Sequence, residues 1–280
     1  MLVPGDVEAL SRLALLARYD GLVVREGITL ALGGGGMFGA YEAGLWAGLQ
    51  GKFALAHVFG ASIGAFNGLA VAAGCPAQEL VDLWLDFREA GEARWRLPWP
   101  PWSGCLDATL FHDYLRRHFD RFRPVLPLTV AITRIWPFQP FSVTGADLTW
   151  RHLAASCTLP LMMPPCRLAE GYCLDGGIFA AVPAWAAIDA GYERVVAVNI
   201  LQGGGARALG ALKSAICAAG RFDARVSGNR PDERVVWVEP SRRLGPLKLS
   251  AKWDVTLARD WIALGREDAP DVLRRIQQWG

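Results

Sequence analysis

Ser62 is the first residue whose surroundings suggest chemistry, because it lies between two glycines in the pattern Gly60-x-Ser62-x-Gly64. The segment before it, FALAHVFG, is a predicted strand, and the segment after it, IGAFNGLAVAAG, is a predicted buried helix. A sharp strand-to-helix turn exposes a serine hydroxyl, and glycines two residues before and after the serine relieve the crowding there. We therefore predict a nucleophile elbow with Ser62 as the nucleophile.

A serine nucleophile needs a base, and the sequence offers two kinds. All four histidines lie within the first 152 residues, whereas an α/β-hydrolase triad places its histidine last in the chain. A triad would therefore have to use His112, His118 or His152, and we do not favour it. The alternative base is Asp175, which two glycines follow in CLDGGIF. Asp-Gly-Gly is a common turn, but this turn would place the carboxylate close to a strand end.

A glycine-rich segment, LGGGGMFGAY, follows the first predicted strand and leads into a predicted helix. The backbone amides of Gly34, Gly35 and Gly36 would then lie at a positive helix end, where they could stabilise an oxyanion or bind a phosphate. A dinucleotide pattern can be traced through Gly34, Gly36 and Gly39, but no acidic residue follows at the required distance. The Walker pattern lacks its Gly-Lys-Ser/Thr. We therefore favour an oxyanion hole over a nucleotide site.

These motifs need a framework, and the sequence predicts an α/β fold. Five short apolar runs rich in β-branched residues are predicted strands: Ile28–Leu32, His57–Phe59, Leu128–Ile132, Val195–Ile200 and Val235–Val238. Helical patterns lie between and after them: the segment opened by Pro76, Ala108–Phe119, Ala184–Ala190 and Asp268–Trp279. Alternating strands and helices predict a three-layer fold with a mostly parallel central sheet and helices on both of its faces.

The length of 280 residues, with 52% apolar content, suits one domain. We expect a single domain over 1–280, with an N-terminal helical extension at 1–27, a catalytic core at 28–200 that contains all three motifs, and the C-terminal part of the same domain at 201–280. Phe53–Gln78 is free of charges, but glycines and polar residues interrupt the apolar run that a membrane span needs. With no recognisable signal peptide, the expected location is cytoplasmic.

Composition excludes several classes of function. The net charge is +2, and no basic run alternates with aromatic residues, so we expect no nucleic-acid partner. The six cysteines form no metal-binding or redox pattern, so no metal or cofactor is expected. Residues 204–280 contain 14 Lys and Arg against 9 Asp and Glu. This excess is either a solvated basic face or an attraction to an anionic lipid surface.

Aromatic residues gather in segments that proline interrupts. The loop WRLPWPPWSGC could dock in a membrane interface, line a substrate entrance or pack over the core. The residues of interest for acyl-chain or membrane contact are Trp95, Trp99 and Trp102, and a wider apolar entrance could add Trp136, Phe138 and Phe141.

The glycine-rich loop, the Gly-x-Ser-x-Gly elbow and Asp-Gly-Gly, in this order, resemble the patatin-like phospholipase family. AASCTLPLMMPP resembles the segment that precedes the catalytic aspartate in that family, and GYERVVAVNI resembles the strand that follows it. The resemblance implies a Ser62–Asp175 dyad without histidine, an oxyanion hole at Gly34–Gly36, no cofactor, and a lipid ester or phospholipid substrate. The tryptophan-rich loop and the basic residues 204–280 leave peripheral contact with a membrane as a further possibility.

Two positions depart from the family pattern. Phe38 stands where the family usually has Arg or Lys, and Ala180 and Ala181 stand where an Asn is common. The leading prediction is a serine lipid acyl hydrolase of the phospholipase A or lysophospholipase type. The alternative is a weakly active or inactive lipid-binding or regulatory protein on the same fold. The sequence does not indicate a protein activator.

Overall fold

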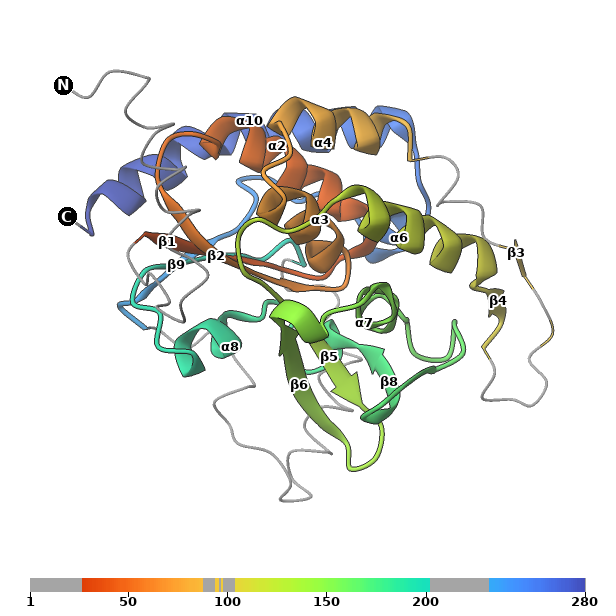
Figure 1. Ribbon diagram of the computed structural model, residues 1–280. Coiled ribbons are helices and arrows are strands. Elements are labelled where there is room, and N and C mark those ends of the chain that lie inside the picture. The colour runs from red at the N-terminus through yellow and green to blue at the C-terminus, as the bar shows by residue number, and fades with distance from the viewer. Residues whose placement is uncertain (1–26, 88–93, 96, 98–103, 202–231, 280) are drawn as a thin grey trace.

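The central sheet determines where every candidate residue lies. The computed structural model describes residues 27–87, 94–95, 97, 104–201 and 232–279 (Figure 1). The main sheet has the order β10-β9-β1-β2-β5-β8-β7, and β6 pairs with β5 outside this path. Its strands are β1 Ile28–Leu32, β2 Leu55–Ala61, β5 Leu128–Arg134, β6 Gln139–Thr144, β7 Cys166–Leu168, β8 Gly171–Asp175, β9 Val195–Val198 and β10 Val235–Val238. A separate pair joins β3 Arg94–Trp95 to β4 Leu106–Asp107.

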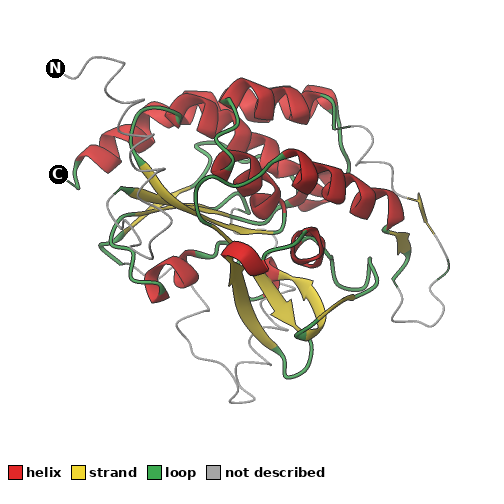
Figure 2. Ribbon diagram, in the orientation of Figure 1, coloured by secondary structure: helices red, strands yellow, loops and turns green. Residues whose placement is uncertain are grey.

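Helices cover both faces of this sheet, so the predicted three-layer α/β fold is confirmed (Figure 2). The α-helices are α2 Gly39–Leu49, α3 Ile63–Ala72, α4 Ala77–Leu85, α6 Thr109–Arg121, α7 Trp150–Ser156, α8 Ala184–Asp189 and α10 Val255–Gln277. Short 3-10 turns are η1 Gly36–Phe38, η3 Gly145–Asp147, η4 Gly176–Ile178 and η6 Leu247–Ala251. In Figure 1, α2, α3, α4 and α10 lie on one side of β1 and β2, and α8 lies on the other.

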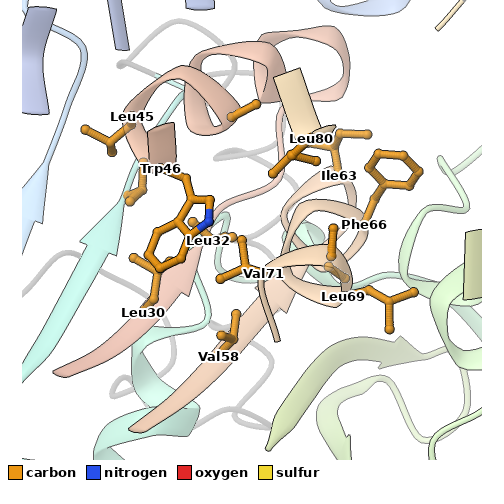
Figure 3. Close-up of a cluster of buried hydrophobic side chains, with 14 of the residues drawn as sticks. Leu30, Leu32, Leu45, Trp46, Val58, Ile63, Phe66, Leu69, Val71 and Leu80 are labelled. Atoms are coloured by element: carbon orange, nitrogen blue, oxygen red, sulfur yellow. The ribbon is translucent and has the colours of Figure 1, made fainter. Parts of the chain in front are cut away.

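Both faces of the central strands are buried because alternate side chains enter two different cores. Leu30 and Leu32 of β1 pack into the larger core, together with residues of α2, α3, α4 and α10 (Figure 3). Ala31, between them, packs into a smaller core with Phe59 and Ala187. A strand buried on both faces is apolar throughout, which is why β1 could be predicted from its sequence.

The sheet is mixed, and its antiparallel part was not predicted. β10, β9, β1, β2 and β5 are parallel neighbours, as expected. β6 and β8 pair antiparallel with β5, and β7 pairs antiparallel with β8. These three strands include exposed and half-buried residues, so they lack the continuous apolar run by which a fully buried strand is recognised.

Element boundaries follow the prediction with one large difference. The C-terminal helix begins at Val255, well before the predicted Asp268, because Asp254 caps it by accepting from the amides of Thr256 and Leu257. Pro270 lies inside this helix. Because proline is typical of the first turn of a helix, its position favours a predicted helix start near residue 268. The predicted N-terminal helix lies outside the described residues.

Candidate active site

Ser62 lies at the turn between β2 and α3, in the N-cap position of the helix. Its φ of 54° and ψ of −128° are strained for a residue with a Cβ. A Cβ on Gly60 would lie 2.5 Å from the Cα of Ala65, and one on Gly64 would lie 2.3 Å from the carbonyl oxygen of Leu32. Glycine is therefore required by close backbone approach at both positions that the motif specifies.

Asp175 reaches Ser62 because β2 and β8 share one edge of β5. β6 occupies the other edge from Thr129 to Arg134. On the shared edge, β2 pairs with the first half of β5 and ends with Ala61 opposite Ala131, while β8 pairs with the second half and ends with Asp175 opposite Ile132. The two strands run toward each other, so their carboxyl ends meet. The antiparallel direction of β8 is what brings the aspartate to the serine.

The two side chains are in direct contact. Ser62 Oγ donates to Asp175 Oδ2 at 2.5 Å, and the other oxygen, Oδ1, accepts from the amide of Gly177 at 2.7 Å. Asp175 is only 5% exposed. Burial raises its pKa from the ordinary 3.8 to about 6, and the hydrogen bonds from Ser62 and Gly177 partly oppose this. The carboxylate is therefore a stronger base than an exposed aspartate.

The amides of the glycine-rich loop divide into two pairs. Gly33 donates to Glu42 Oε1 at 2.9 Å, and Gly34 donates to the carbonyl of Ala181 at 2.7 Å. Within the described part of the chain, the amides of Gly35 and Gly36 donate to no acceptor. Gly34 was predicted to supply an oxyanion donor, but its amide is already engaged. The next two residues follow directly, and Gly36 lines the same cavity as Ser62.

Ser156 holds the elbow in place, a role that no sequence motif indicated. Its Oγ accepts from the amide of Ser62 at 2.8 Å and donates to the carbonyl of Ala131 at 2.7 Å. The hydroxyl of α7 therefore bridges the turn after β2 to β5. Ser156 lies in AASCTLPLMMPP, the segment that sequence analysis identified only by its resemblance.

The histidines considered as alternative bases make contacts elsewhere. His118 is buried, its Nε2 lies 3.0 Å from the carbonyl oxygen of Phe66, and burial lowers its pKa to about 3. His152 Nδ1 bonds to Thr149 at the start of α7. His112 Nε2 lies 4.0 Å from Cys166 Sγ. The partner of Ser62 Oγ is Asp175 rather than an imidazole.

Ser62 lines a cavity of about 110 Å³. Its lining is mainly apolar and comes from segments far apart in the sequence: Gly36, Met37, Ser62, Ile63, Leu106, Asp107, Phe111, Cys157, Leu159, Met162, Met163, Ser250 and Ala251. Trp136, Phe138 and Phe141, which were predicted to form an apolar entrance, are not among these lining residues. Trp136 is instead 78% exposed.

The aromatic loop can be located only in part. Trp95 belongs to β3, whereas Trp99 and Trp102 lie outside the described residues. Contact of these three residues with an acyl chain or a membrane therefore stays a prediction.

Both departures from the family pattern have structural roles in the loop region. Phe38 is buried and packs edge-on against Trp261 of α10, with ring centroids 5.1 Å apart. Aromatic packing thus ties the glycine-rich loop to α10. Ala181 supplies the carbonyl that accepts from Gly34. A backbone acceptor is available whatever side chain stands at this position.

The described residues contain no group of three or more His, Cys, Asp or Glu side chains that is arranged to hold a metal ion. Likewise, none of the described helices combines the length and apolarity needed to cross a membrane.

The chain is similar to one family model and to solved structures. The model of the family described as patatin-like phospholipase matches residues 30–188. No curated protein matches the sequence. VipD from Legionella pneumophila is similar in structure, with a TM-score of 0.53 and 15% identity over 89% of this chain and 67% of VipD. The type III effector protein ExoU gives a TM-score of 0.42 and 14% identity, with 89% of this chain and 53% of ExoU covered.

Proposed function

The chain belongs to the patatin-like phospholipase family, and from this premise we propose that it is a serine lipid acyl hydrolase of the phospholipase A or lysophospholipase type. The observation that carries the proposal is the 2.5 Å hydrogen bond from Ser62 Oγ to the buried carboxylate of Asp175, at the wall of an apolar cavity. A serine paired with a base of raised pKa, beside open backbone donors, has the parts needed for acyl transfer.

The proposed reaction begins with attack of Ser62 Oγ on the ester carbonyl, while Asp175 Oδ2 accepts the hydroxyl proton. A bond forms from Oγ to the carbonyl carbon, and the carbonyl electron pair moves onto oxygen. When the bond to the leaving alcohol breaks, Asp175 returns its proton to that alcohol. Water then attacks the acyl-enzyme in the same way, which releases the fatty acid and restores Ser62.

The oxyanion in this scheme is stabilised by backbone amides. We assign this role to Gly35 and Gly36, because the amide of Gly34 already donates to Ala181. The α3 helix begins immediately after Ser62, so its positive end also favours negative charge at this position. In a known hydrolase, loss of one such donor costs about 3 kcal/mol of transition-state stabilisation.

The cavity suits an acyl chain better than a polar substrate. Met37, Met162 and Met163 are among its lining residues, and the unbranched methionine side chain adapts to flexible apolar ligands. Four exposed leucines lie on segments that line this cavity. We call them the leucine rim: Leu110, Leu159, Leu161 and Leu247. We propose that the leucine rim contacts the lipid surface from which the substrate enters.

The experiment that tests the proposal measures p-nitrophenol release from a short-chain ester and fatty-acid release from phospholipid vesicles. Ser62→Ala and Asp175→Asn should each lower kcat at least about 10³-fold, because each removes half of the nucleophile–base pair. The exposed Asp271→Asn variant serves as a control and should keep parental rates. Folded parent protein with no activity on either substrate, and no labelling of Ser62 by a fluorophosphonate, would favour the inactive lipid-binding alternative.

A further inference from the structure

Glu42 is a buried carboxylate that the proposed reaction does not use. It lies in the first turn of α2 and is 2% exposed. Both of its oxygens accept hydrogen bonds: Oε1 from the amide of Gly33 and Oε2 from Asn67 Nδ2, each at 2.9 Å. Burial raises the pKa of Glu42 to about 8, and the two hydrogen bonds oppose this shift. A buried carboxylate is costly to ionise unless hydrogen-bond donors stabilise its charge, and each oxygen of Glu42 has such a donor.

The neighbours of Asn67 determine which of its groups faces Glu42. Trp84 Nε1 donates to Asn67 Oδ1 at 2.8 Å, and Asn67 Nδ2 also donates to the carbonyl of Gly39 at 2.9 Å. An indole N–H can only donate and a carbonyl can only accept. The amide of Asn67 therefore has one consistent orientation, with its NH₂ group toward Glu42. Both oxygens of Glu42 thus face groups that can only donate.

This contact lies between the two parts of the proposed site. Gly33 is the first residue of the glycine-rich loop. The next residue, Gly34, lies close to the nucleophile, because a Cβ on Gly34 would lie 3.1 Å from Ser62 Cβ. Asn67 belongs to α3, the helix that starts after Ser62. Glu42 is therefore bonded to the loop through one oxygen and to the helix of the elbow through the other.

We propose that Glu42 is a positioning residue, which holds the amides of Gly35 and Gly36 in place relative to Ser62 by tying Gly33 to Asn67. With Gly33 held by Glu42 and Gly34 held by Ala181, the next two amides are left open at a fixed place beside the nucleophile. The role rests on the proposed hydrolase function. It predicts that a change at Glu42 acts on the chemical step rather than on substrate binding, because Glu42 is not part of the cavity lining.

Two substitutions at Glu42 test its hydrogen bonds to Gly33 and Asn67. Glu42→Ala removes both acceptors, and kcat for a p-nitrophenyl ester should fall about 100-fold, since a displacement near 1 Å has this effect on catalysis. Glu42→Gln keeps the size of the side chain and one acceptor, but it turns an NH₂ group toward a donor. Its kcat should fall about tenfold. KM should stay within about threefold of the parental value in both variants.

A double-mutant cycle gives the sharper test. Asn67→Ala removes the donor to Glu42 Oε2 together with the bond to the carbonyl of Gly39. If Glu42 and Asn67 act through one contact, Glu42→Ala combined with Asn67→Ala should lower kcat by clearly less than the product of the two single effects. Glu267→Gln changes an exposed glutamate on α10 that pairs with Arg242, and this matched control should leave kcat unchanged.

The outcomes distinguish this inference from the function on which it rests. Parental kcat in Glu42→Gln and Glu42→Ala, with only a lower melting temperature, would mean that Glu42 is purely structural and would overturn the inference. Absence of Ser62-dependent turnover in the parent protein would overturn the proposed function, and the inference with it. A fall in kcat at constant KM, with effects in the double variant that are less than multiplicative, is the expected result.

Discussion

Asp175 can accept a proton only while it is ionised, so its pKa sets the acid limit of the proposed activity. Burial raises that pKa to about 6. We expect kcat for a short-chain ester to be constant above about pH 7 and to fall below pH 6, tenfold for each unit once the carboxyl is mostly protonated. A pH series of kcat at saturating substrate measures this. An acid limb near pH 4 would contradict the raised pKa.

The same shift makes a prediction for stability. The folded protein binds the Asp175 proton more tightly than the unfolded chain, so the resulting stabilisation is complete below about pH 3.8 and is lost as the pH rises through about 6. Asp175→Asn removes the buried charge. At pH 8 it should raise the free energy of unfolding by up to about 3 kcal/mol, the equivalent of a shift of roughly two pKa units.

Urea unfolding at pH 8 and pH 4 measures this difference. The gain from Asp175→Asn should shrink at pH 4, where the parental carboxyl is already protonated in the folded state. Asp271→Asn changes an exposed aspartate and should have little effect at pH 8. A less stable Asp175→Asn variant at pH 8 would mean that the hydrogen bonds of the carboxylate outweigh its burial.

Single residues could be predicted from the sequence where a short pattern requires them. Ser62 and Asp175 are in hydrogen-bond contact, and each lies in a motif of a few residues. Gly34 was placed with the oxyanion donors because its sequence position is equivalent to that of Gly35. What distinguishes the two is the carbonyl of Ala181, which lies far along the chain. A local pattern contains no information on such a partner.

At the scale of elements, β5 joins the two halves of the site, and Ser156 of α7 completes the joint. Ser156 Oγ bonds to Ser62 and to Ala131. Ser156→Ala would leave a buried amide and a buried carbonyl each short of a partner, so it should lower the free energy of unfolding by about 2–4 kcal/mol. The strained elbow would also relax, and kcat should fall about tenfold or more.

Chemical denaturation and ester kinetics on the same preparation measure both effects. Ser142→Ala, an exposed serine on β6, is the matched control and should change stability by less than about 0.5 kcal/mol. If Ser156→Ala lowered stability but left kcat at the parental value, the position of the elbow would not depend on this hydroxyl.

Elements buried on both sides could be predicted, and half-exposed ones could not. β1 and β10 have the predicted bounds, and α8 differs by one residue. β8 was not predicted as an antiparallel strand, although its direction brings Asp175 to the serine. A short strand with one exposed side differs little from a loop in composition. Its pairing is decided by the edge of β5 that β6 leaves free.

At the scale of the whole molecule, the cavity assembles from distant segments, which explains why the sequence did not identify its walls. Met37 follows the glycine-rich loop, Phe111 lies on α6, and Ser250 belongs to η6. Their shared location depends on the complete fold. The aromatic residues proposed for this role were chosen by type and by sequence proximity, which cannot tell a cavity wall from an exposed turn such as Trp136.

The leucine rim should decide how the protein meets an aggregated substrate. Leu161 is 86% exposed and has a φ of 65°, and Leu247 is 46% exposed. Water solvates both poorly, and burial of one leucine in an apolar phase gains about 2 kcal/mol. Leu161→Asp and Leu247→Asp should each lower vesicle co-sedimentation, and the rate of fatty-acid release from vesicles, at least about tenfold. Hydrolysis of a soluble short-chain ester should change less than twofold.

Val125→Asp is the matched control for the rim. Val125 is 45% exposed and lies near Gly74, just beyond the end of α3 that is opposite Ser62. A ten-residue helix is about 15 Å long. Because of this separation, we expect a membrane that contacts the leucine rim not to contact Val125. Equal losses in Val125→Asp and Leu161→Asp would indicate a general effect of charge. Unchanged vesicle binding in both rim variants would place the lipid contact elsewhere, with Trp95, Trp99 and Trp102 the next residues to change.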